Sequence, residues 1–337
     1  MPEQHSLILK MDNVSSHDNS GEVFRLALSF LLADKKKLRE FLSKQASENS
    51  VYKDKHHEIN KESYANWIKN DLKLTHFSDS EISISWEKAQ NRLSICEPNK
   101  VRILFRSDFG SIRKDLDKDG EMPSHIYYRG TLSPARSITI VGSRKVTPLK
   151  SEVLSAGLDK NLRSLLEYFP DNKWSIVSGL ALGCDTLAHR SALKLGAITI
   201  AVLPTSPSAN EIYPKENVAL ADDILKNGGL LISEYPPLTA LEKYSFPARN
   251  KIQAAIGELL VVLEASKRSG TLHTVRAAKK QKKPIYHDQD IKEADWLKKM
   301  GSKPIDLQDA NSLKNKVMDL DSPSASKTNP WVPDSES

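Results

Sequence analysis

The segment from Ser137 to His287 constrains the fold most, because short apolar runs alternate there with longer amphipathic stretches. Unbroken apolar runs such as Ala197–Leu203 are typical of parallel strands that are buried on both faces of a sheet. The stretches between them carry apolar residues three and four positions apart, which predicts helices packed against that sheet. The pattern therefore predicts an α/β fold with a mostly parallel sheet and helices on both faces.

The predicted elements follow one another in a regular order. Two short strands lead into the segment, and six more alternate with helices inside it. The predicted strands cover residues 101–105, 126–130, 138–141, 175–178, 197–203, 230–233, 259–263 and 284–287. The predicted helices cover residues 149–168, 216–226, 249–256 and 271–281, with one more around Ala188 and His189.

The rest of the chain differs in composition from this core. Residues 1–20 and 321–337 are polar and rich in Ser, Asp or Pro, which predicts disordered tails. Apolar residues at helical spacing predict a small N-terminal helical domain over 21–99, followed by the sheet domain over 100–290. Two helices are expected within 291–320. Nothing in residues 21–99 identifies a helix that reads DNA.

Small residues collect where three of the predicted strands end. Gly142, Ser143 and Arg144 follow the strand at 138–141, while Ser178-Gly179 and Ser269-Gly270 follow two others. Loops after parallel strands share one edge of a sheet, and glycine lets the backbone approach a ligand there. With amides that can point at a phosphate and an arginine that can grip it, these loops predict an anion-binding crevice. A tight turn with a solvated Arg144 explains that tripeptide equally well.

Three other polar groups have competing interpretations. Arg249 and Asn250 follow a long proline-rich loop and are expected to open a helix, where they can bind phosphate or simply cap the helix. Asp185 and His189 lie four residues apart, which suggests a hydrogen-bonded pair on one helix face. No nucleophile with a neighbouring base accompanies them, and Cys184 is expected to be an inert packed side chain. No catalytic residue is therefore predicted.

Several classes of protein are disfavoured. The chain has no Walker loop and no Gly-x-Gly-x-x-Gly fingerprint, which argues against the common nucleotide cofactors, and no cofactor is predicted. Cys96 and Cys184 lack metal-ligand spacing and His56-His57 reads as a solvated loop, so no metal site is predicted. Without a signal peptide or a bilayer-length apolar run, a cytoplasmic location with no membrane partner is expected. The formal net charge of +6 modestly favours a polyanionic partner.

Taken in order, the motifs of the core resemble the DNA-processing protein A family, which is also called DprA or Smf. The first matching motifs are Ile140-Val-Gly-Ser-Arg144, Ser178-Gly-Leu-Ala-x-Gly-x-Asp185 with Ala188-His189, Thr199-Ile-Ala-Val-Leu203 and Tyr213-Pro-x-x-Asn217. They continue with Leu231-Ile-Ser-Glu-Tyr-Pro236, Phe246-Pro-x-Arg-Asn250 and Val261-Val-Leu-Glu-Ala265, followed by Ser269-Gly-Thr-Leu272. Their shared order over roughly residues 100–287 makes the resemblance specific.

The resemblance implies an extended Rossmann-like domain that binds single-stranded DNA and often dimerises. Such proteins protect incoming strands during natural transformation and help to load a RecA-type recombinase. By this analogy Arg144 is a principal phosphate contact. The residues expected to shape the pocket or its positive rim are Gly142, Ser143, Lys145, Ser178, Gly179, Arg249, Asn250, Lys267, Arg268, Ser269 and Gly270. Binding is then expected to depend on salt and little on sequence.

The chain departs from the family pattern in places, which keeps a second interpretation open. It lacks the Pro-Gly that usually follows a segment like Pro284–His287, has His273 at an aliphatic position, and shows no C-terminal winged helix. The alternative is a nucleotide-sensing protein, or an antitoxin or phage-defence component with a toxin or defence partner. A phosphoribohydrolase is disfavoured, because its Pro-Gly-Gly-x-Gly-Thr signature is missing.

Overall fold

A computed structural model gives the structure of the protein. It describes residues 20–31, 61–71, 77–112, 116, 122–133, 135–169, 174–267 and 269–321. The chain divides into two units, Met1–Pro98 and Asn99–Ser337. The predicted tails lie outside the described residues, except for Ser20 and Asp321, which each belong to a helix.

The first unit is helical in its described part. Its elements are α2 (Ser20–Leu31), α4 (Lys61–Asn66), the π-helical turn η2 (Trp67–Asp71) and α5 (Asp79–Cys96). Helix α5 begins with a capping box, in which Ser78 and Glu81 each bond the other's backbone amide. The rings of Tyr64 and Trp86 pack 5.3 Å apart inside this unit. The described part of this unit agrees with the helices predicted within residues 21–99.

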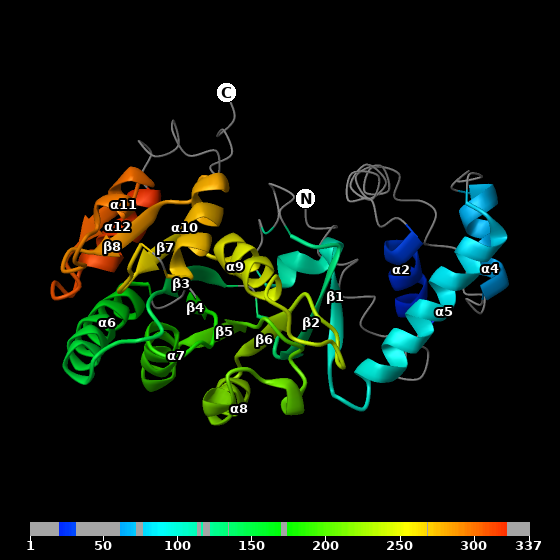
Figure 1. Ribbon diagram of the computed structural model, residues 1–337, viewed down its shortest axis with the longest axis horizontal. Helices are drawn as coiled ribbons and strands as arrows, with labels where there is room; N and C mark the ends of the chain where they lie inside the picture. The colour runs from blue at the N-terminus through cyan, green and yellow to red at the C-terminus, as the bar shows by residue number, and fades with distance from the viewer. Residues whose placement is uncertain are drawn as a thin grey trace. The chain divides into compact units, whose positions relative to one another are not determined.

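The second unit is built on a twisted sheet with nine strands in its described part (Figure 1). Their order is β1-β2-β6-β5-β4-β3-β7-β8-β9, and β3 to β9 are parallel. The strands are β1 (Arg102–Phe105), β2 (His125–Gly130), β3 (Arg136–Val141), β4 (Trp174–Ser178), β5 (Ile198–Val202), β6 (Leu230–Ser233), β7 (Leu259–Val262), β8 (Ile285–Asp288) and β9 (Lys303–Ile305). Strand order reverses at β3, which lies between β4 and β7, so the switch point falls at the loops after these strands.

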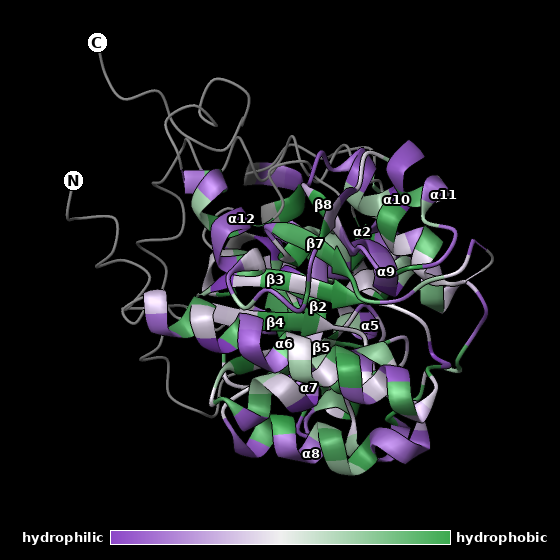
Figure 2. Cartoon of the chain, turned by 90° about the vertical axis from the view of Figure 1, so that its left-hand side faces the viewer, coloured by the Kyte–Doolittle hydropathy of each residue, from purple (hydrophilic) through white to green (hydrophobic). Residues whose placement is uncertain are grey.

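Helices cover both faces of the sheet. One face packs against α6 (Pro148–Tyr168), α7 (Cys184–Lys194), α8 (Val218–Lys226) and α12 (Ser312–Asp321). The other packs against α9 (Ser245–Ile256), α10 (Thr271–Lys280) and α11 (Asp295–Lys299). Successive residues of a strand point to opposite faces, and in β4 Ile176 joins the first core and Val177 the second. Figure 2 shows the resulting hydrophobic strands between helices with mixed surfaces. The predicted α/β fold is confirmed.

Two predicted boundaries were wrong. The sheet does not end at 284–287, because β9 pairs in parallel with β8, placing Lys303 beside Tyr286. A three-residue strand with a proline carries little sequence signal, and proline is tolerated here because β9 lies at the sheet edge. Helix α9 begins at Ser245 rather than at residue 249, so Arg249 lies in its second turn and does not open it.

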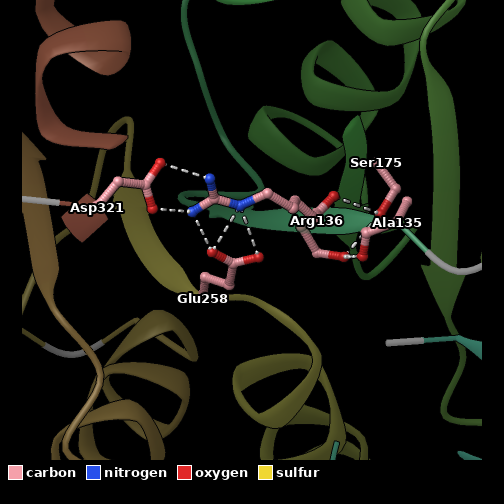
Figure 3. Close-up of polar contacts among 6 residues, drawn as sticks. Ala135, Arg136, Ser175, Glu258 and Asp321 are labelled. Atoms are coloured by element: carbon pink, nitrogen blue, oxygen red, sulfur yellow. Dashed lines mark hydrogen bonds and ion pairs between the residues drawn. The ribbon is translucent and has the colours of Figure 1, made fainter. Parts of the chain in front are cut away.

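A network around Arg136 joins the amino end of β3 to the last described helix (Figure 3). The guanidinium bonds Glu258 at 2.7 Å and Asp321 at 2.7 Å, and it lies 4.7 Å from the ring of Trp174. Asp321 was predicted to begin the disordered tail. It is instead the last residue of α12, because Arg136 supplies a partner from far away in sequence.

No helix in the described parts of the chain has the length and apolar character needed to cross a membrane.

Candidate functional site

The loop after β3 is built by a close approach of three segments. A Cβ on Gly142 would lie 2.5 Å from Cys184 Sγ and 2.8 Å from the carbonyl of Glu264, so only glycine fits. Ser143 donates its amide to that same Glu264 carbonyl, at 2.7 Å, and its hydroxyl bonds the backbone of Lys145. Ser143 therefore shapes the loop through its amide and its hydroxyl, and a contact with phosphate stays a prediction.

The loop after β4 is held by a buried carboxylate. Asp185, at the start of α7, accepts bonds from the amides of Gly179 at 3.2 Å and Ala181 at 3.3 Å. Between them Leu180 adopts a left-handed backbone with φ of 59°, which is strained for a leucine. Asn217 donates to the Leu180 carbonyl at 2.8 Å and holds the loop from the other side. These contacts hold the backbone of residues 179–181 in one conformation.

Ser178 has a structural role. It is fully buried, and its hydroxyl donates to the carbonyl of Ile140 at 2.6 Å. This bond ties β4 to β3 just before both strands end. Ser178 does not line the pocket described below, although the sequence predicted it there.

Arg249 is the most unusual side chain of this edge. It is only 7% exposed, and its Nη1 lies 3.5 Å from Asp185 Oδ2. Its Nε and Nη1 have no hydrogen-bond partner within the described structure. The guanidinium lies so close over Gly179 that a Cβ at that position would overlap it. A buried, charged donor without a full set of partners is costly, so this site favours an anionic ligand.

The charges around Arg249 are unbalanced. Burial lowers the pKa of Arg249; Asp185 opposes this shift, and nearby Arg144 adds to it. Burial raises the pKa of Asp185, against the opposing effect of Arg249 and of the amides of Ala181 and Gly179. Asp185 pairs with Arg249, and Arg144 adds a second positive charge nearby, which leaves a net positive potential.

Arg144 joins the loop after β3 to two other segments. Its guanidinium lies 5.5 Å from the ring centre of Phe246, which is a cation–π contact. A Cβ on Gly270 would lie 3.6 Å from Arg144 Nη2, so Arg144 also reaches the loop that precedes α10. The loops after β3, β4 and β7 therefore meet around Arg144 and Arg249. This agrees with the prediction that the three loops lie on one edge of the sheet.

A pocket of about 90 Å³ opens between these arginines. It is lined by Arg144, Gly179, Ala181, Leu182, Pro204, Tyr213, Pro214, Phe246 and Arg249. The rings of Tyr213 and Phe246 meet edge to face, with centres 5.9 Å apart and planes at 72°. Tyr213 is 38% exposed, so part of its ring is open to solvent. The pocket thus combines cationic donors with aromatic surface.

The predicted site residues divide into groups. Arg144, Gly179 and Arg249 line the pocket, and Gly270 lies beside Arg144. Lys145 and Lys267 are exposed on the loops after β3 and β7, while Ser269 bonds the Ser266 carbonyl through its hydroxyl. Asn250 is buried in α9, and Arg268 lies outside the described residues.

Tyr213, Leu182 and the two prolines were not predicted to line the site, because a lone residue in an irregular loop carries no periodic signal. The aromatic–proline pairs Tyr213-Pro214 and Phe246-Pro247 were the only hint in the sequence.

The expected bond between Asp185 and His189 is replaced by other contacts. His189 Nδ1 lies 2.7 Å from Thr199 Oγ1, whose own hydrogen goes to the carbonyl of Ile176. His189 Nδ1 is therefore the donor and the ring is neutral, since burial lowers its pKa to about 3. Burial also raises the pKa of the Cys184 thiol. Neither side chain is a ready base or nucleophile near neutral pH.

The sequence matches those of known proteins over the sheet unit. The model of the family described as DNA recombination-mediator protein A matches residues 103–314. DNA processing protein DprA of Bacillus subtilis is 34% identical over 167 residues, which are 49% of this chain and 52% of that protein. Protein Smf of Escherichia coli is 39% identical over 208 residues, 60% of this chain and 52% of that protein. The chain thus spans about half the length of the curated relatives it matches.

Two solved structures resemble the fold of this chain. The structure of DprA from Streptococcus pneumoniae has the same fold, with a TM-score of 0.62 over 85% of this chain and 94% of that one, at 23% identity. The structure of DprA from Helicobacter pylori, described for its single-stranded DNA binding mode, has a TM-score of 0.50 at 26% identity. It covers 65% of this chain and 96% of that one. The resemblance seen in the sequence is confirmed, and the chain belongs to the DNA recombination-mediator protein A family.

Proposed function

We propose that the pocket between Arg144 and Arg249 binds the phosphate backbone of single-stranded DNA. The observation that carries this proposal is the buried guanidinium of Arg249, which lines the pocket and whose Nε and Nη1 have no hydrogen-bond partner among the described residues. A phosphate oxygen supplies the acceptor that these donors lack and the negative charge that Asp185 alone does not balance. The structure of the Helicobacter pylori relative, described for its single-stranded DNA binding mode, supports the same ligand.

The size and lining of the pocket favour a polymer over a small nucleotide. Its volume of about 90 Å³ is well below the roughly 300–1,000 Å³ that small-molecule sites usually enclose. It suits one phosphate group of a chain that continues outside. Beside it, the rings of Tyr213 and Phe246 offer a surface on which bases can stack, as proteins that bind single strands without sequence preference do.

In the cell, this activity fits a protein that protects single strands and assists a RecA-type recombinase during DNA uptake or recombination. Family membership supports this role, together with a cytoplasmic location and action as a homodimer. We further propose that the protein acts by binding and not by catalysis. The acid–base and thiol groups beside the pocket, His189 and Cys184, are buried and held neutral, which supports this view.

The test is a titration of a labelled oligothymidylate of about 20 nucleotides, followed by fluorescence anisotropy at low salt. Arg144→Ala should weaken binding at least tenfold, because a charge-assisted contact contributes about 1.5–3 kcal/mol. Arg190→Ala is the matched control, since Arg190 is an exposed arginine on α7 outside the pocket lining. It should bind like the parent protein.

Equal affinity of Arg144→Ala and the parent would contradict the proposal. Calorimetry with mono- and dinucleotides separates the alternative inferred from the sequence. Tight binding of a nucleotide, with none of the oligonucleotide, would favour a nucleotide-sensing protein.

A further inference from the structure

The positive charge of the chain is concentrated in one segment. Residues 265–287 contain seven basic residues and no acidic one, so they account for more than the whole formal net charge of +6. The basic residues are Lys267, Arg268, Arg276, Lys279, Lys280, Lys282 and Lys283. Such segregation is the electrostatic signature of a surface that meets a polyanion.

Three of these seven basic residues, Arg276, Lys279 and Lys280, are exposed on α10. The inner face of the helix is buried through Thr271, Thr274, Val275 and Ala278. His273, Arg276 and Lys280 are exposed and follow one another at three- and four-residue spacing, so they form one stripe along the helix. We call these three residues the α10 stripe. Lys283 is not part of it, because its ammonium is buried and bonds the carbonyl of Ala255.

The α10 stripe begins at the pocket. Gly270, the residue before α10, lies against the guanidinium of Arg144. From there the ten residues of α10 extend over about 15 Å. The amino end of the helix, which carries the positive end of its dipole, is the end near the pocket.

A second helix adds charge near the far end of α10. Helices α9 and α10 run beside each other (Figure 1), and Gln281 donates to the carbonyl of Lys251 at 3.2 Å. Lys251 is exposed on α9. The positive surface therefore continues from Arg144, along α10, to the neighbourhood of Lys251.

We propose that the DNA strand held at the pocket continues along the α10 stripe, where Arg276 and Lys280 contact the phosphates next in sequence. This inference rests on the proposed function and assigns residues outside the pocket to the same ligand. Charge complementarity supports it, and so does the position of Arg144 beside Gly270, the residue that precedes α10. A stretch of about 15 Å is long enough for more than one further phosphate of the strand.

The experiment compares two lengths of oligothymidylate, about 4 and about 20 nucleotides, on the full chain. Arg276→Gln/Lys280→Gln should lose about tenfold in affinity for the longer strand and leave the shorter one unchanged. The slope of log K against log salt should become shallower by about 1.4, since each lost contact removes about 0.7 with single strands. The control is Lys160→Gln/Arg163→Gln, which removes an exposed lysine and arginine from α6 on the opposite face of the sheet.

Each outcome decides the inference. Unchanged binding of the longer strand would overturn it and leave the stripe to another partner, such as an acidic protein surface. The inference would also be overturned if the α10 variant lost as much affinity for the shorter strand as for the longer one. The same holds if the α6 control lost as much affinity as the α10 variant, because the effect would then depend on net charge alone. Arg144→Ala separates this failure from that of the proposed function. If it weakens both lengths while the α10 variant weakens neither, only the inference about α10 fails.

Discussion

Two arginines lie near opposite ends of β3, and their charges are balanced to different degrees. At the amino end, Glu258 and Asp321 each bond Arg136 at 2.7 Å (Figure 3). The ring of Trp174 also packs on its guanidinium. Past the carboxyl end, Arg249 has one carboxylate at 3.5 Å and two nitrogens without hydrogen-bond partners in the described structure. The better-matched arginine is also the more exposed, with 25% of its side chain accessible against 8%.

The two environments move the pKa of the arginines in opposite directions. Burial lowers the pKa of Arg136, but its bonds to Glu258 and Asp321 outweigh that effect and raise it. Burial lowers the pKa of Arg249, and Asp185 does not compensate. The two arginines therefore differ in the number of carboxylates and hydrogen-bond acceptors around the guanidinium. A full set of partners is typical of an arginine that stabilises the fold, and an incomplete set is typical of one that binds a ligand.

The largest expected effect is the loss of stability caused by Arg249→Met. This change leaves Asp185 buried without its cation, which should lower the free energy of unfolding by about 3–5 kcal/mol. Urea unfolding measures it. The double variant Asp185→Asn/Arg249→Met should recover much of the loss, because it removes both members of the pair. A loss below about 1 kcal/mol for the single variant would show that the pair is no more coupled than a surface ion pair and would break the comparison.

The second prediction concerns the pH dependence of stability. Burial and the nearby Arg249 lower the pKa of His189 to about 3. Between that value and the ordinary pKa of about 6.5, the unfolded chain binds a proton that the folded chain excludes. Stability contributed by the neutral ring is therefore present above about pH 6.5 and lost as pH falls, at up to about 1.4 kcal/mol per unit, or about 2 kcal/mol at pH 5.

His189→Gln should flatten this dependence, as urea midpoints at pH 5 and pH 7 would report. Burial also lowers the pKa of His287, so a smaller slope of the same sign should persist. A slope identical in parent and variant would show that His189 is not held neutral.

The smallest effect is expected for Arg136→Leu. Its carboxylate partners are partly exposed, at 20% for Glu258 and 45% for Asp321, so solvent should limit the loss of stability to about 1–2 kcal/mol. Oligonucleotide affinity should not change, because Arg136 lies at the end of the sheet away from the pocket. Normal stability with impaired DNA binding would reverse the roles assigned to the two ends of β3.

Local periodicity predicted most of the sheet unit. Strand β6 spans the predicted Leu230–Ser233, and β7 at Leu259–Val262 differs from its prediction by one residue. Both are unbroken apolar runs, and such runs are recognisable because burial on two faces excludes polar residues. The order of loops after β3, β4 and β7 likewise followed from the alternation of strands and helices, since parallel strands place their carboxyl ends on one edge.

The sequence by itself thus determined the α/β class, the family and the concentration of positive charge before Asp288. Only the tertiary structure decided which polar groups are available to a ligand. Ser143 and Ser178 look like phosphate binders in sequence, but distant carbonyls and neighbouring backbone already occupy them. Arg249 looks like a helix cap, yet it is buried over Gly179, and two of its nitrogens have no hydrogen-bond partner in the part of the chain that the structure describes. The reason is that hydrogen-bond saturation depends on segments far apart in the chain, which no local pattern records.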